Sequence, residues 1–514
     1  MTPDDLRALV AEATAAGTAE ARWQAVAAVP PKLVEELVHG TADASAAGAV
    51  VVAIGVAASP GVGSGVLCLN VGDVLDADEA GRPAVLVCVE TTPADEVGMR
   101  LAAGIVTARG GTASHAAVVA RGWGIPAVVG ADGLEVADDH VVVGHHRIDR
   151  GDEIGLDGGT GEVFAGSLVG GSSPVADDAR ADLEVVLGWA DEVRGDRAGV
   201  WANADRADDA ALARSLGADG VGLCRTEHLF LGDRLPLVRR FLLADGPEAE
   251  AAALEDLGEA QREDLAAVLA AIAPLPVTVR LLDAPLHEFL GDDAPPEWRE
   301  HNPMLGTRGV RLAVLRGGLY RMQVRALLAA MGEVEAVGHH PHVRVMVPLV
   351  ATAEEMALVG GWIRDEIASA AHDEPPPVGM MIETPRAALL AGDMAHHADF
   401  FSFGTNDLTQ MVFGLSRDDA GQRLMGEYLG RDLLVADPFA HLDEGVVAPM
   451  VAAATRAGRM ARPDLEASVC GEHGGDPASI RLLVAAGVDH VSCSPYRVPV
   501  ARLAVAQALI DLDR

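Results

Sequence analysis

The sequence is poor in positive charge, and lysine is almost missing from it. Among 514 residues, Lys and Arg together number 39 against 76 Asp and Glu, and Lys32 is the single lysine. The formal net charge of -37 argues against nucleic acid or an anionic membrane surface as a partner, because both are polyanions. An anionic substrate must therefore be held by a local cluster of arginines in an acidic background.

Cysteine and long apolar runs are also scarce. The five cysteines are odd in number and show no CxxC spacing, which argues against a disulfide framework or a zinc site and fits a reducing compartment. The first residues, MTPDDLR, are acidic, and the apolar stretch 48–58 is broken by glycine and too short to span a bilayer. We therefore expect a cytoplasmic protein. No glycine motif of the Walker or Rossmann type is present in the sequence.

The apolar residues that are present divide the chain into regions. Residues 1–45 show the spacing of two or three short helices. From 46 to 166, short β-rich runs separated by Gly, Pro and Asp predict a compact β/α domain. Residues 167–180 are rich in Gly, Ser and Asp and predict a flexible linker, which is either an ordinary connection or a hinge.

The remaining region, 181–514, alternates between strand and helix patterns. Its eight apolar strand candidates lie at 199–205, 220–227, 277–283, 343–350, 378–384, 400–407, 467–474 and 490–496. Eight βα units in one domain predict a TIM barrel, with long insertions after the second and third strands. The predicted fold class is therefore α/β, a β/α domain followed by a (β/α)8 barrel.

The stretch GIVTARGGTASHAAVVARGWGIP, residues 104–126, carries the clearest chemical signal. His115 stands where a glycine-rich loop enters a helix, and Ser114 is a candidate N-cap. The first N–H groups of a helix and its dipole favour an anion at this position, so an imidazole there can take up a phosphoryl group. The alternative is a structural histidine in a loop.

Arginines follow several of the predicted barrel strands. Arg225 ends the second strand, Arg280 lies in the third, Arg308 lies in the insertion NPMLGTRG, and Arg417 follows the sixth. A guanidinium binds phosphate and carboxylate through two hydrogen bonds, so arginines that converge on one barrel mouth suit a small substrate carrying both groups. Phosphoenolpyruvate is such a substrate. The alternative for each arginine is a salt bridge.

Two carboxylates and a thiol complete the predicted mouth. Glu383 and Asp407 end the fifth and sixth strand candidates, and such a pair fits Mg²⁺, which takes one or two protein carboxylates. The alternative is that each carboxylate caps the helix after it. Cys470 ends the seventh strand, where a thiol could give a proton to carbon, although a plain buried thiol is also compatible with the pattern.

Several of these segments resemble one known family. Residues 104–126 resemble the phosphohistidine loop of the phosphoenolpyruvate-utilising enzymes, which include pyruvate phosphate dikinase, phosphoenolpyruvate synthase and enzyme I of the sugar phosphotransferase system. The resemblance is strongest to the barrel of pyruvate phosphate dikinase, in VTVRLLDAPLHEFL, NPMLGTRGVRL, MMIETPRAAL, FFSFGTNDLTQMVFG and CGEHGGDPASI.

The resemblance implies a role for each candidate residue. It implies that 46–166 is a swivelling domain whose His115 is phosphorylated, that Cys470 is the acid/base at the methylene carbon, and that Mg²⁺ is bound by Glu383 and Asp407. The implied substrate-binding residues are Arg225, Arg280, Arg308, Glu383, Gly404, Thr405, Asn406, Asp407 and Arg417.

The implied activity is reversible phosphoryl transfer between phosphoenolpyruvate and His115, with pyruvate as the other product. Dikinases carry an N-terminal ATP-grasp domain and enzyme I a helical docking domain, and residues 1–45 are too few for either. We therefore expect the nucleotide step to be absent or supplied in trans by a protein partner, and we expect a homodimer formed through the barrel. Two alternatives stay open: an enzyme I-like phosphotransferase that serves a carrier protein, and a non-catalytic sensor of phosphoenolpyruvate.

Overall fold

The computed structural model describes residues 1–39, 42–43, 49–92, 95–111, 114–170, 174–230, 234–291, 294–370, 372, 374–417 and 424–514. The chain forms two compact units. The first unit contains Met1–Gly195, Leu415–His441 and Arg502–Arg514, and the second contains Asp196–Gly414 and Leu442–Ala501. In the part of the chain that the structure describes, no helix combines the length and apolar character needed to cross a membrane.

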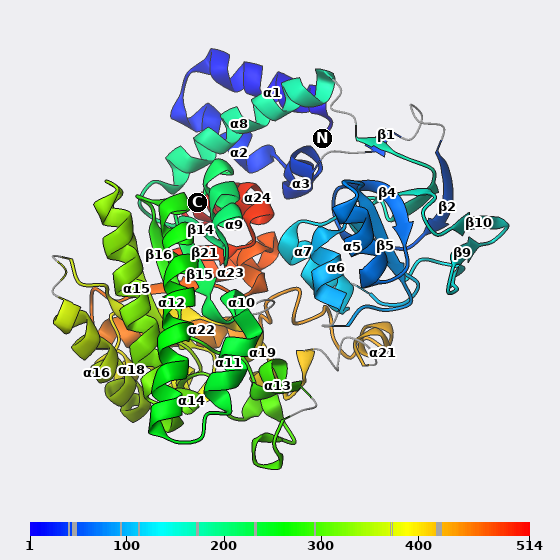
Figure 1. The fold of residues 1–514 in the computed structure, drawn as a ribbon. Helices are drawn as coiled ribbons and strands as arrows, with labels where there is room; N and C mark the ends of the chain where they lie inside the picture. The colour runs from blue at the N-terminus through cyan, green and yellow to red at the C-terminus, as the bar shows by residue number, and fades with distance from the viewer. Residues whose placement is uncertain are drawn as a thin grey trace. The chain divides into compact units, whose positions relative to one another are not determined.

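An eight-stranded sheet is the centre of the first unit, with strand order β2-β12-β11-β4-β5-β6-β7-β3 (Figure 1). Its strands β4 to β7 run parallel, and the other pairings are antiparallel. Only Gly55 separates β2 from β3, although these strands lie at opposite ends of the order, so the sheet must curl. The strands are β2 (Val50–Ile54), β3 (Val56–Ser59), β4 (Val62–Cys68), β5 (Ala84–Cys88), β6 (Gly104–Thr107), β7 (Ala127–Val129), β11 (Glu153–Asp157) and β12 (Glu162–Ala165).

The two faces of this sheet have different covers because successive strand residues point to opposite sides. Leu86 packs in a core with side chains of the helices α5 (Val71–Glu79), α6 (Glu96–Leu101) and α7 (His115–Trp123). Its neighbours Val85 and Val87 pack on the other face. There a three-stranded sheet of β8 (Leu134–Val136), β9 (His140–Val143) and β10 (His146–Asp149) contributes Leu134, Val141 and Ile148.

The N-terminal residues form three helices, as their apolar spacing predicts. These are α1 (Pro3–Ala16), α2 (Ala19–Ala28) and α3 (Pro31–His39), and all three pack against α8 (Pro174–Arg194). Arg180 Nε of α8 donates to the carbonyl of Leu37 at 2.9 Å. Gln507, near the end of α24 (Val498–Leu512), donates to the carbonyls of Val26 and Val29.

The predicted linker 167–180 contains regular structure. Strand β13 (Val169–Gly170) pairs with β1 (Ala42–Asp43), and α8 begins at Pro174, so only 171–173 lie outside the described residues. The Gly and Ser residues of this stretch suggested a flexible segment, although a helix begins within it at Pro174. Proline at the first position favours helix initiation because its φ is already fixed near the helical value. The predicted domain boundary near 45 also falls outside the described residues, and the domain limits stay a prediction.

The second unit is a closed barrel of eight parallel strands in sequence order, which confirms the predicted fold class. Each predicted strand is present, and most end a few residues earlier than expected because the polar residues after them turn into loops or helices. The strands are β14 (Gly199–Asn203), β15 (Val221–Arg225), β16 (Pro276–Arg280), β17 (His342–Val347), β18 (Val378–Ile382), β19 (Phe400–Phe403), β20 (Glu466–Val469) and β21 (His490–Cys493).

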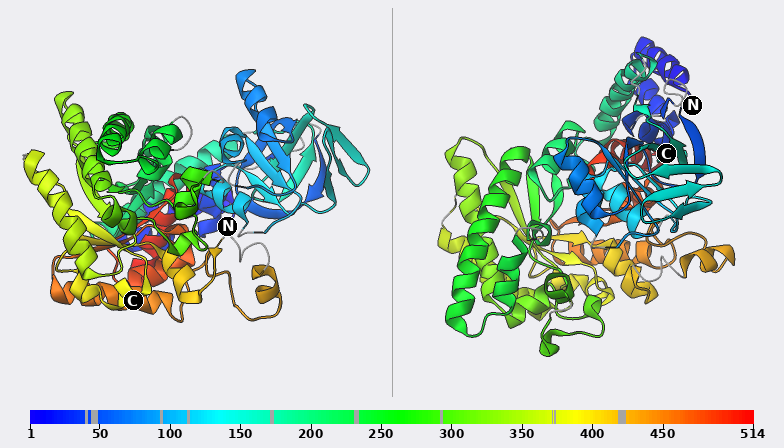
Figure 2. Two further views of the ribbon diagram at one scale, coloured as in Figure 1. Left: turned by 60° about the horizontal axis from the view of Figure 1, so that its bottom comes forward. Right: turned by 45° about the vertical axis from the view of Figure 1, so that its right-hand side comes forward.

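Helices follow every strand, and the insertions after β15 and β16 are long, as predicted. The insertion after β15 contains α12, the insertion after β16 contains α15, and α16 follows β17. In the structure α15 lies between α12 and α16 and packs against both (Figure 1, Figure 2). The helices are α9 (Ala207–Ser215), α10 (Thr226–Leu229), α11 (Leu235–Leu242), α12 (Pro247–Ile272), α13 (Leu286–Leu290), η4 (Pro296–Trp298), η5 (Pro303–Leu305), α14 (Val310–Leu315), α15 (Gly318–Ala336), α16 (Ala353–Ala370), α17 (Pro385–Leu389), α18 (Ala391–Met394), α19 (Thr405–Phe413), α22 (Val447–Ala461), η6 (Glu472–Gly475), α23 (Pro477–Ala485) and η7 (Pro495–Arg497); α21 (Met425–Gly430) belongs to the first unit.

A polar and aromatic layer closes the N-terminal end of the barrel interior. Arg344 of β17 lies 4.0 Å from the ring centroid of Phe400 and donates to Glu466 Oε1 at 2.5 Å. His490 contacts the same carboxylate oxygen at 3.1 Å and stacks on Trp201. This layer links strands on opposite sides of the barrel and leaves the C-terminal end as the mouth.

Candidate functional site

His115 is the first residue of α7, and the backbone before it is held in place by several local contacts. Ser114 is the N-cap, as predicted, and its Oγ accepts from Ala117 N. The loop before it is anchored to the end of β5, because Arg109 N donates to Val89 O at 3.0 Å. Gly110 has φ 118°, a conformation that favours glycine. Residues 112–113 of the motif lie outside the described residues.

The imidazole of His115 is half-buried and has a defined partner. Its Nδ1 lies 2.9 Å from Thr91 Oγ1. In the tautomer that carries its proton on Nδ1 and donates it to this hydroxyl, Nε2 carries the lone pair and could act as a nucleophile. The start of α7 places backbone N–H groups beside the ring, where they favour a phosphoryl anion.

Arg225 and Arg280 are the last residues of neighbouring strands and are register partners, so they lie side by side at the barrel mouth. Arg280 is buried and forms ion pairs with Glu227 and with Asp283, the latter at 3.1 Å. Burial raises the pKa of Glu227, but the positive charge of Arg280 together with His228, Arg225 and a backbone hydrogen bond gives a net downward shift.

Arg308 reaches the same mouth from the insertion after β16. Its Nε and Nη2 donate to the two oxygens of Asp283 at 3.0 and 2.7 Å, and its Nη1 and Nη2 approach Asp407 at 3.4 and 3.3 Å. Asp283 therefore joins Arg280 and Arg308 into one cluster. Two guanidinium groups that share one carboxylate could together contact a small dianionic group.

Arg225 is oriented by Asp205, which follows β14. Asp205 Oδ1 accepts from Arg225 N at 2.6 Å, and Oδ2 accepts from Arg225 Nη1 at 3.2 Å. The same Oδ2 lies 2.7 Å from His228 Nδ1. Burial lowers the pKa of His228, but the charge and hydrogen bond of Asp205 together with the charge of Glu227 raise the pKa overall.

Glu383 lies directly after β18 and is almost fully buried. Its Oε1 accepts from Leu349 N at 2.6 Å. A Cβ at Gly404 would come within 2.6 Å of Oε2, so this position of the carboxylate requires glycine at 404. Burial raises the pKa of Glu383 well above its usual value, and the nearby charges of Asp407 and Asp283 raise it further.

These carboxylates fit a divalent cation. A cation between Glu383 and Asp407 would relieve both the repulsion and the burial that raise the pKa of Glu383. Within the described ranges no group of three or more His, Cys, Asp or Glu could hold a metal. The prediction that Asp407 ends the sixth strand is wrong. Asp407 lies in the first turn of α19, because β19 already ends at Phe403.

The residues around Asp407 are fixed by contacts with the loop after β20. Thr405 Oγ1 lies 2.8 Å from His473 Nδ1, and both side chains are fully buried. Asn406 Oδ1 accepts from Glu472 N at 3.0 Å. A Cβ at Gly471 would clash with Thr405 Oγ1. The structure therefore brings Gly404, Thr405 and Asn406 to one edge of the mouth.

Cys470 follows β20 and is buried in a cluster with Leu223, Met346, Met381 and Phe400. Its carbonyl accepts from Asn203 Nδ2 at 3.1 Å. Burial raises the pKa of the thiol above its usual value, so the thiol keeps its proton at neutral pH. A protonated thiol is the form that can give a proton to a carbanion.

Two predicted residues are not part of this barrel cluster. Arg417 lies in Leu415–His441, which belongs to the first unit, and His115 belongs to the first unit as well. The other predicted barrel residues belong to the second unit. Sequence reasoning missed Thr91, Asp205, Glu227 and Asp283 as site residues. Of these, Asp205, Glu227 and Asp283 end strand candidates, which is the position that located Glu383, and they could have been found on that criterion.

Comparison with protein-family models decides the family. Residues 181–510 match the PEP-binding domain of the PEP-utilising enzymes, and residues 81–161 match the mobile domain of the same enzymes. The chain belongs to the phosphoenolpyruvate-utilising enzymes. This confirms the predicted resemblance, with His115 in the mobile domain and the arginine cluster in the PEP-binding domain.

Relatives of this member of the family include pyruvate, phosphate dikinases from plants. The chain is 42% identical over 516 residues to pyruvate, phosphate dikinase 1 of Arabidopsis thaliana, a match that covers 95% of the chain and 53% of the relative. It is 41% identical over 521 residues to pyruvate, phosphate dikinase 2 of Oryza sativa subsp. japonica, covering 95% and 58%. The chain thus spans about half the length of the curated relatives it matches. Among solved structures, a citrate lyase from Burkholderia xenovorans matches with TM-score 0.33 and 16% identity over 60% of the chain and 77% of that protein.

Proposed function

We propose that this phosphoenolpyruvate-utilising enzyme catalyses reversible, Mg²⁺-dependent phosphoryl transfer between phosphoenolpyruvate and His115, with pyruvate as the other product. The observation that carries the proposal is the barrel mouth. There Arg225 and Arg280 are register partners, Asp283 joins Arg280 to Arg308, and Arg308 and Glu383 both interact with Asp407. These groups can receive a molecule that carries both a phosphate and a carboxylate.

The reaction is balanced by groups on the chain. The P–O bond of phosphoenolpyruvate breaks while a P–N bond forms at His115 Nε2, and the leaving group is the enolate of pyruvate. The Cys470 thiol gives its proton to the methylene carbon of that enolate. Mg²⁺, when bound, supplies charge neutralisation on the phosphoryl and enolate oxygens. The arginines position the substrate and stabilise the charge that builds up during transfer.

The second step of the proposed cycle passes the phosphoryl group between His115 and another donor or acceptor. We propose that a protein partner supplies it, as a nucleotide-binding subunit or a phosphocarrier. The support is that His115 is half-buried at the start of α7, in a unit with its own core, where it can be presented to more than one site. The N-terminal helices pack their apolar faces against α8, so a partner would bind to their exposed faces.

We also propose a cytoplasmic homodimer formed through the barrel. All five cysteines are free thiols, as a reducing compartment would leave them. Large apolar side chains are exposed on neighbouring barrel helices, with Leu389 of α17 at 73% and Met460 of α22 at 82% exposure. Sedimentation velocity of the wild type against Leu389→Glu tests the dimer, because a charge in an apolar interface should give monomers.

Labelling with phosphate tests the central proposal. The protein is mixed with Mg²⁺ and phosphoenolpyruvate carrying radioactive phosphate, and acid-labile phosphohistidine is measured. We expect stoichiometric label in the wild type and in His146→Ala, a control at an exposed histidine of the same unit, and none in His115→Ala. Full labelling of His115→Ala, or no label on the wild type, would contradict the proposal.

A further inference from the structure

The loop Asn302–Gly309 delivers Arg308 to the barrel mouth without regular secondary structure of its own beyond the short η5. Gly309 has φ 56°, and a Cβ there would come within 2.7 Å of Asp283 Oδ1. Arg308 is 4% exposed, so a small change in the loop backbone moves a buried guanidinium. The ion pairs with Asp283 and Asp407 orient its far end, while the loop sets where the side chain begins.

Glu300 contacts the loop at the residue before Arg308. Its Oε1 accepts from Thr307 N at 2.7 Å. A Cβ at Gly306 would clash with the Glu300 carboxylate, so the backbone and the carboxylate are in close contact there. From the other side, Arg311 Nη1 donates to the carbonyls of Leu305 and Gly306 at 2.8 and 3.0 Å.

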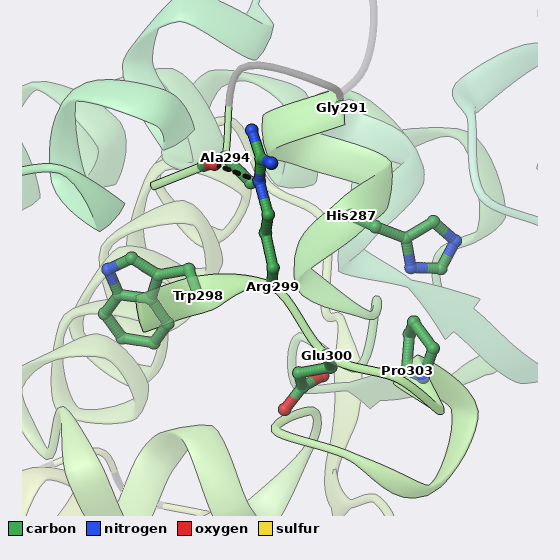
Figure 3. Close-up of a pocket in the computed structure, with 7 residues that line it drawn as sticks. All are labelled: His287, Gly291, Ala294, Trp298, Arg299, Glu300 and Pro303. Carbon is green, nitrogen blue, oxygen red and sulfur yellow. Dashed lines mark hydrogen bonds between the residues drawn. The ribbon is translucent and has the colours of Figure 1, made fainter. Parts of the chain in front are cut away.

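Close packing does not explain what fixes the backbone of Glu300 and of the loop Asn302–Gly309. Glu300, Trp298 and Pro303 line a cavity of about 480 Å³ (Figure 3). Beside a cavity, polar contacts rather than packing must fix the backbone. Among the side chains that the structure describes, Glu300 Oε2 is buried without a hydrogen-bond partner. A buried oxygen without a hydrogen-bond partner lowers the stability of the folded state, so the contacts of Glu300 with the loop must outweigh that loss.

We propose that Glu300 is a positioning residue for Arg308. Its carboxylate holds the Thr307 amide, and through it the backbone that presents the Arg308 guanidinium to the phosphate or carboxylate of the substrate. Arg311 performs the same task from the carbonyl side of the loop. The inference rests on the proposed function, in which Arg308 binds phosphoenolpyruvate.

Two substitutions of Glu300 separate hydrogen bonding from volume. Glu300→Gln keeps an oxygen that accepts from Thr307 N, while Glu300→Met keeps the length of the side chain and removes the acceptor. The rate of His115 labelling is measured at increasing phosphoenolpyruvate, which gives a half-saturating concentration and a maximal rate. For Glu300→Met we expect the half-saturating concentration to rise about 10-fold, as for the loss of one hydrogen bond that orients a charged group.

The maximal rate of Glu300→Met should change little, since the reacting groups stay in place. Glu300→Gln should behave as the wild type. Glu255→Met, at an exposed carboxylate of α12, is the matched control and should leave both values unchanged. A wild-type half-saturating concentration in Glu300→Met would overturn the inference, and so would an equal rise in Glu300→Gln, which would mean that charge rather than the acceptor is what matters.

A double-mutant cycle asks whether Glu300 acts through Arg308. Arg308→Lys alone should raise the half-saturating concentration, and adding Glu300→Met to it should raise it no further, because residues that act through one another are not additive. An equal further rise would show that Glu300 acts elsewhere and would overturn the inference. If Arg308→Lys has no effect while wild-type His115 is labelled, the role of Arg308 fails but the proposed reaction stands.

Arg311→Met provides a second route to the same loop. It releases the carbonyls of Leu305 and Gly306, and we expect the same rise in half-saturating concentration and the same lack of additivity with Arg308→Lys. If Glu300→Met does not fold, as shown by thermal unfolding, Arg311→Met decides the question. An additive effect of Arg311→Met, or none, would then contradict a backbone contact that positions Arg308.

Discussion

The Arg308 guanidinium and the Asp283 carboxylate face each other through two parallel hydrogen bonds, Nε to Oδ1 at 3.0 Å and Nη2 to Oδ2 at 2.7 Å. Asp283 is 1% exposed and also pairs with Arg280 at 3.1 Å. One carboxylate therefore bridges two buried cations, and each cation has a second acidic partner, Glu227 for Arg280 and Asp407 for Arg308. This arrangement holds both guanidinium groups at the mouth.

Asp283→Asn should destabilise the protein strongly. Removing one charge of a buried pair leaves an uncompensated partner and costs about 3 kcal/mol of the free energy of unfolding, measured by urea titration. Asp256→Asn is the matched control, since Asp256 pairs with Arg240 on an exposed surface, and it should cost less than about 1 kcal/mol. Similar losses in the two variants would mean that Asp283 is not essential to the cluster.

Thr91→Val should slow phosphorylation of His115. The hydroxyl lies 2.9 Å from Nδ1, and this contact orients the imidazole whose Nε2 we propose as the nucleophile. We expect single-turnover labelling to fall about 10-fold, the usual effect of losing one orienting hydrogen bond, and Thr91→Ser to keep the wild-type rate. Thr92→Val serves as the neighbouring control, because the Thr92 hydroxyl binds Asp95 instead. A wild-type rate in Thr91→Val would remove Thr91 from the site.

Glu383→Ala and Asp407→Ala should each abolish labelling at limiting Mg²⁺. Each removes one of the two carboxylates that fit the ion. Because burial and neighbouring carboxylates raise the pKa of Glu383, and a metal binds the ionised form, the apparent affinity for Mg²⁺ should increase as pH rises. The readout is the Mg²⁺ titration of labelling at several pH values, with Glu354→Ala on α16 as control. An affinity that falls with rising pH would contradict the metal role of Glu383.

Cys470→Ala should stop exchange of the methyl protons of pyruvate with solvent. The buried thiol has a raised pKa and keeps the proton that the enolate carbon needs. Transfer of the phosphoryl group to His115 should continue, because P–O cleavage depends on the arginines and Mg²⁺. Exchange is followed by NMR in D₂O, and Cys493→Ala, at a buried thiol of β21, is the control. Unchanged exchange in Cys470→Ala would assign the proton to another group.

Glu466→Gln should change the acid stability of the barrel. Burial raises the pKa of Glu466, but the His490 hydrogen bond and the Arg344 charge outweigh it and lower the pKa to about 2. A carboxyl whose pKa is lower in the folded state stabilises the fold above its unfolded pKa of 4.5 and loses this contribution as pH falls to about 2. Wild-type stability should therefore fall over that interval, and the fall should be smaller in Glu466→Gln. Parallel curves by chemical unfolding would show that Glu466 does not contribute.

Much of the fold could be predicted because it depends on local pattern. Apolar runs of strand length are followed by polar residues, and eight of them in alternation with helical patterns suffice for a barrel. Glycine-rich sequence before His115 and a Ser at 114 were enough to predict a helix start. The segment 167–180 was harder, because the pairing of β13 with β1 joins residues more than a hundred positions apart.

Some residues of the candidate site could be predicted from the sequence, and others could be recognised only in the folded structure. Arg225 and Arg280 could be found because a strand end fixes the direction of the residue there. Asp283 and Glu227 end strand candidates too, but which arginine each of them contacts depends on the register of β15 and β16 and the two ion pairs it permits. Glu300 gave no signal at all, since its role depends on the Thr307 amide that the folded insertion brings to it.

By itself, the sequence determined the order of strands and helices, the position of His115 at a helix start and the excess of acidic charge, because each depends on neighbours along the chain. Only the tertiary structure decided which carboxylates share the arginines and which hydroxyl orients His115. These contacts join residues far apart in sequence, and their energy depends on burial and on distances of a few ångström, which no local pattern encodes.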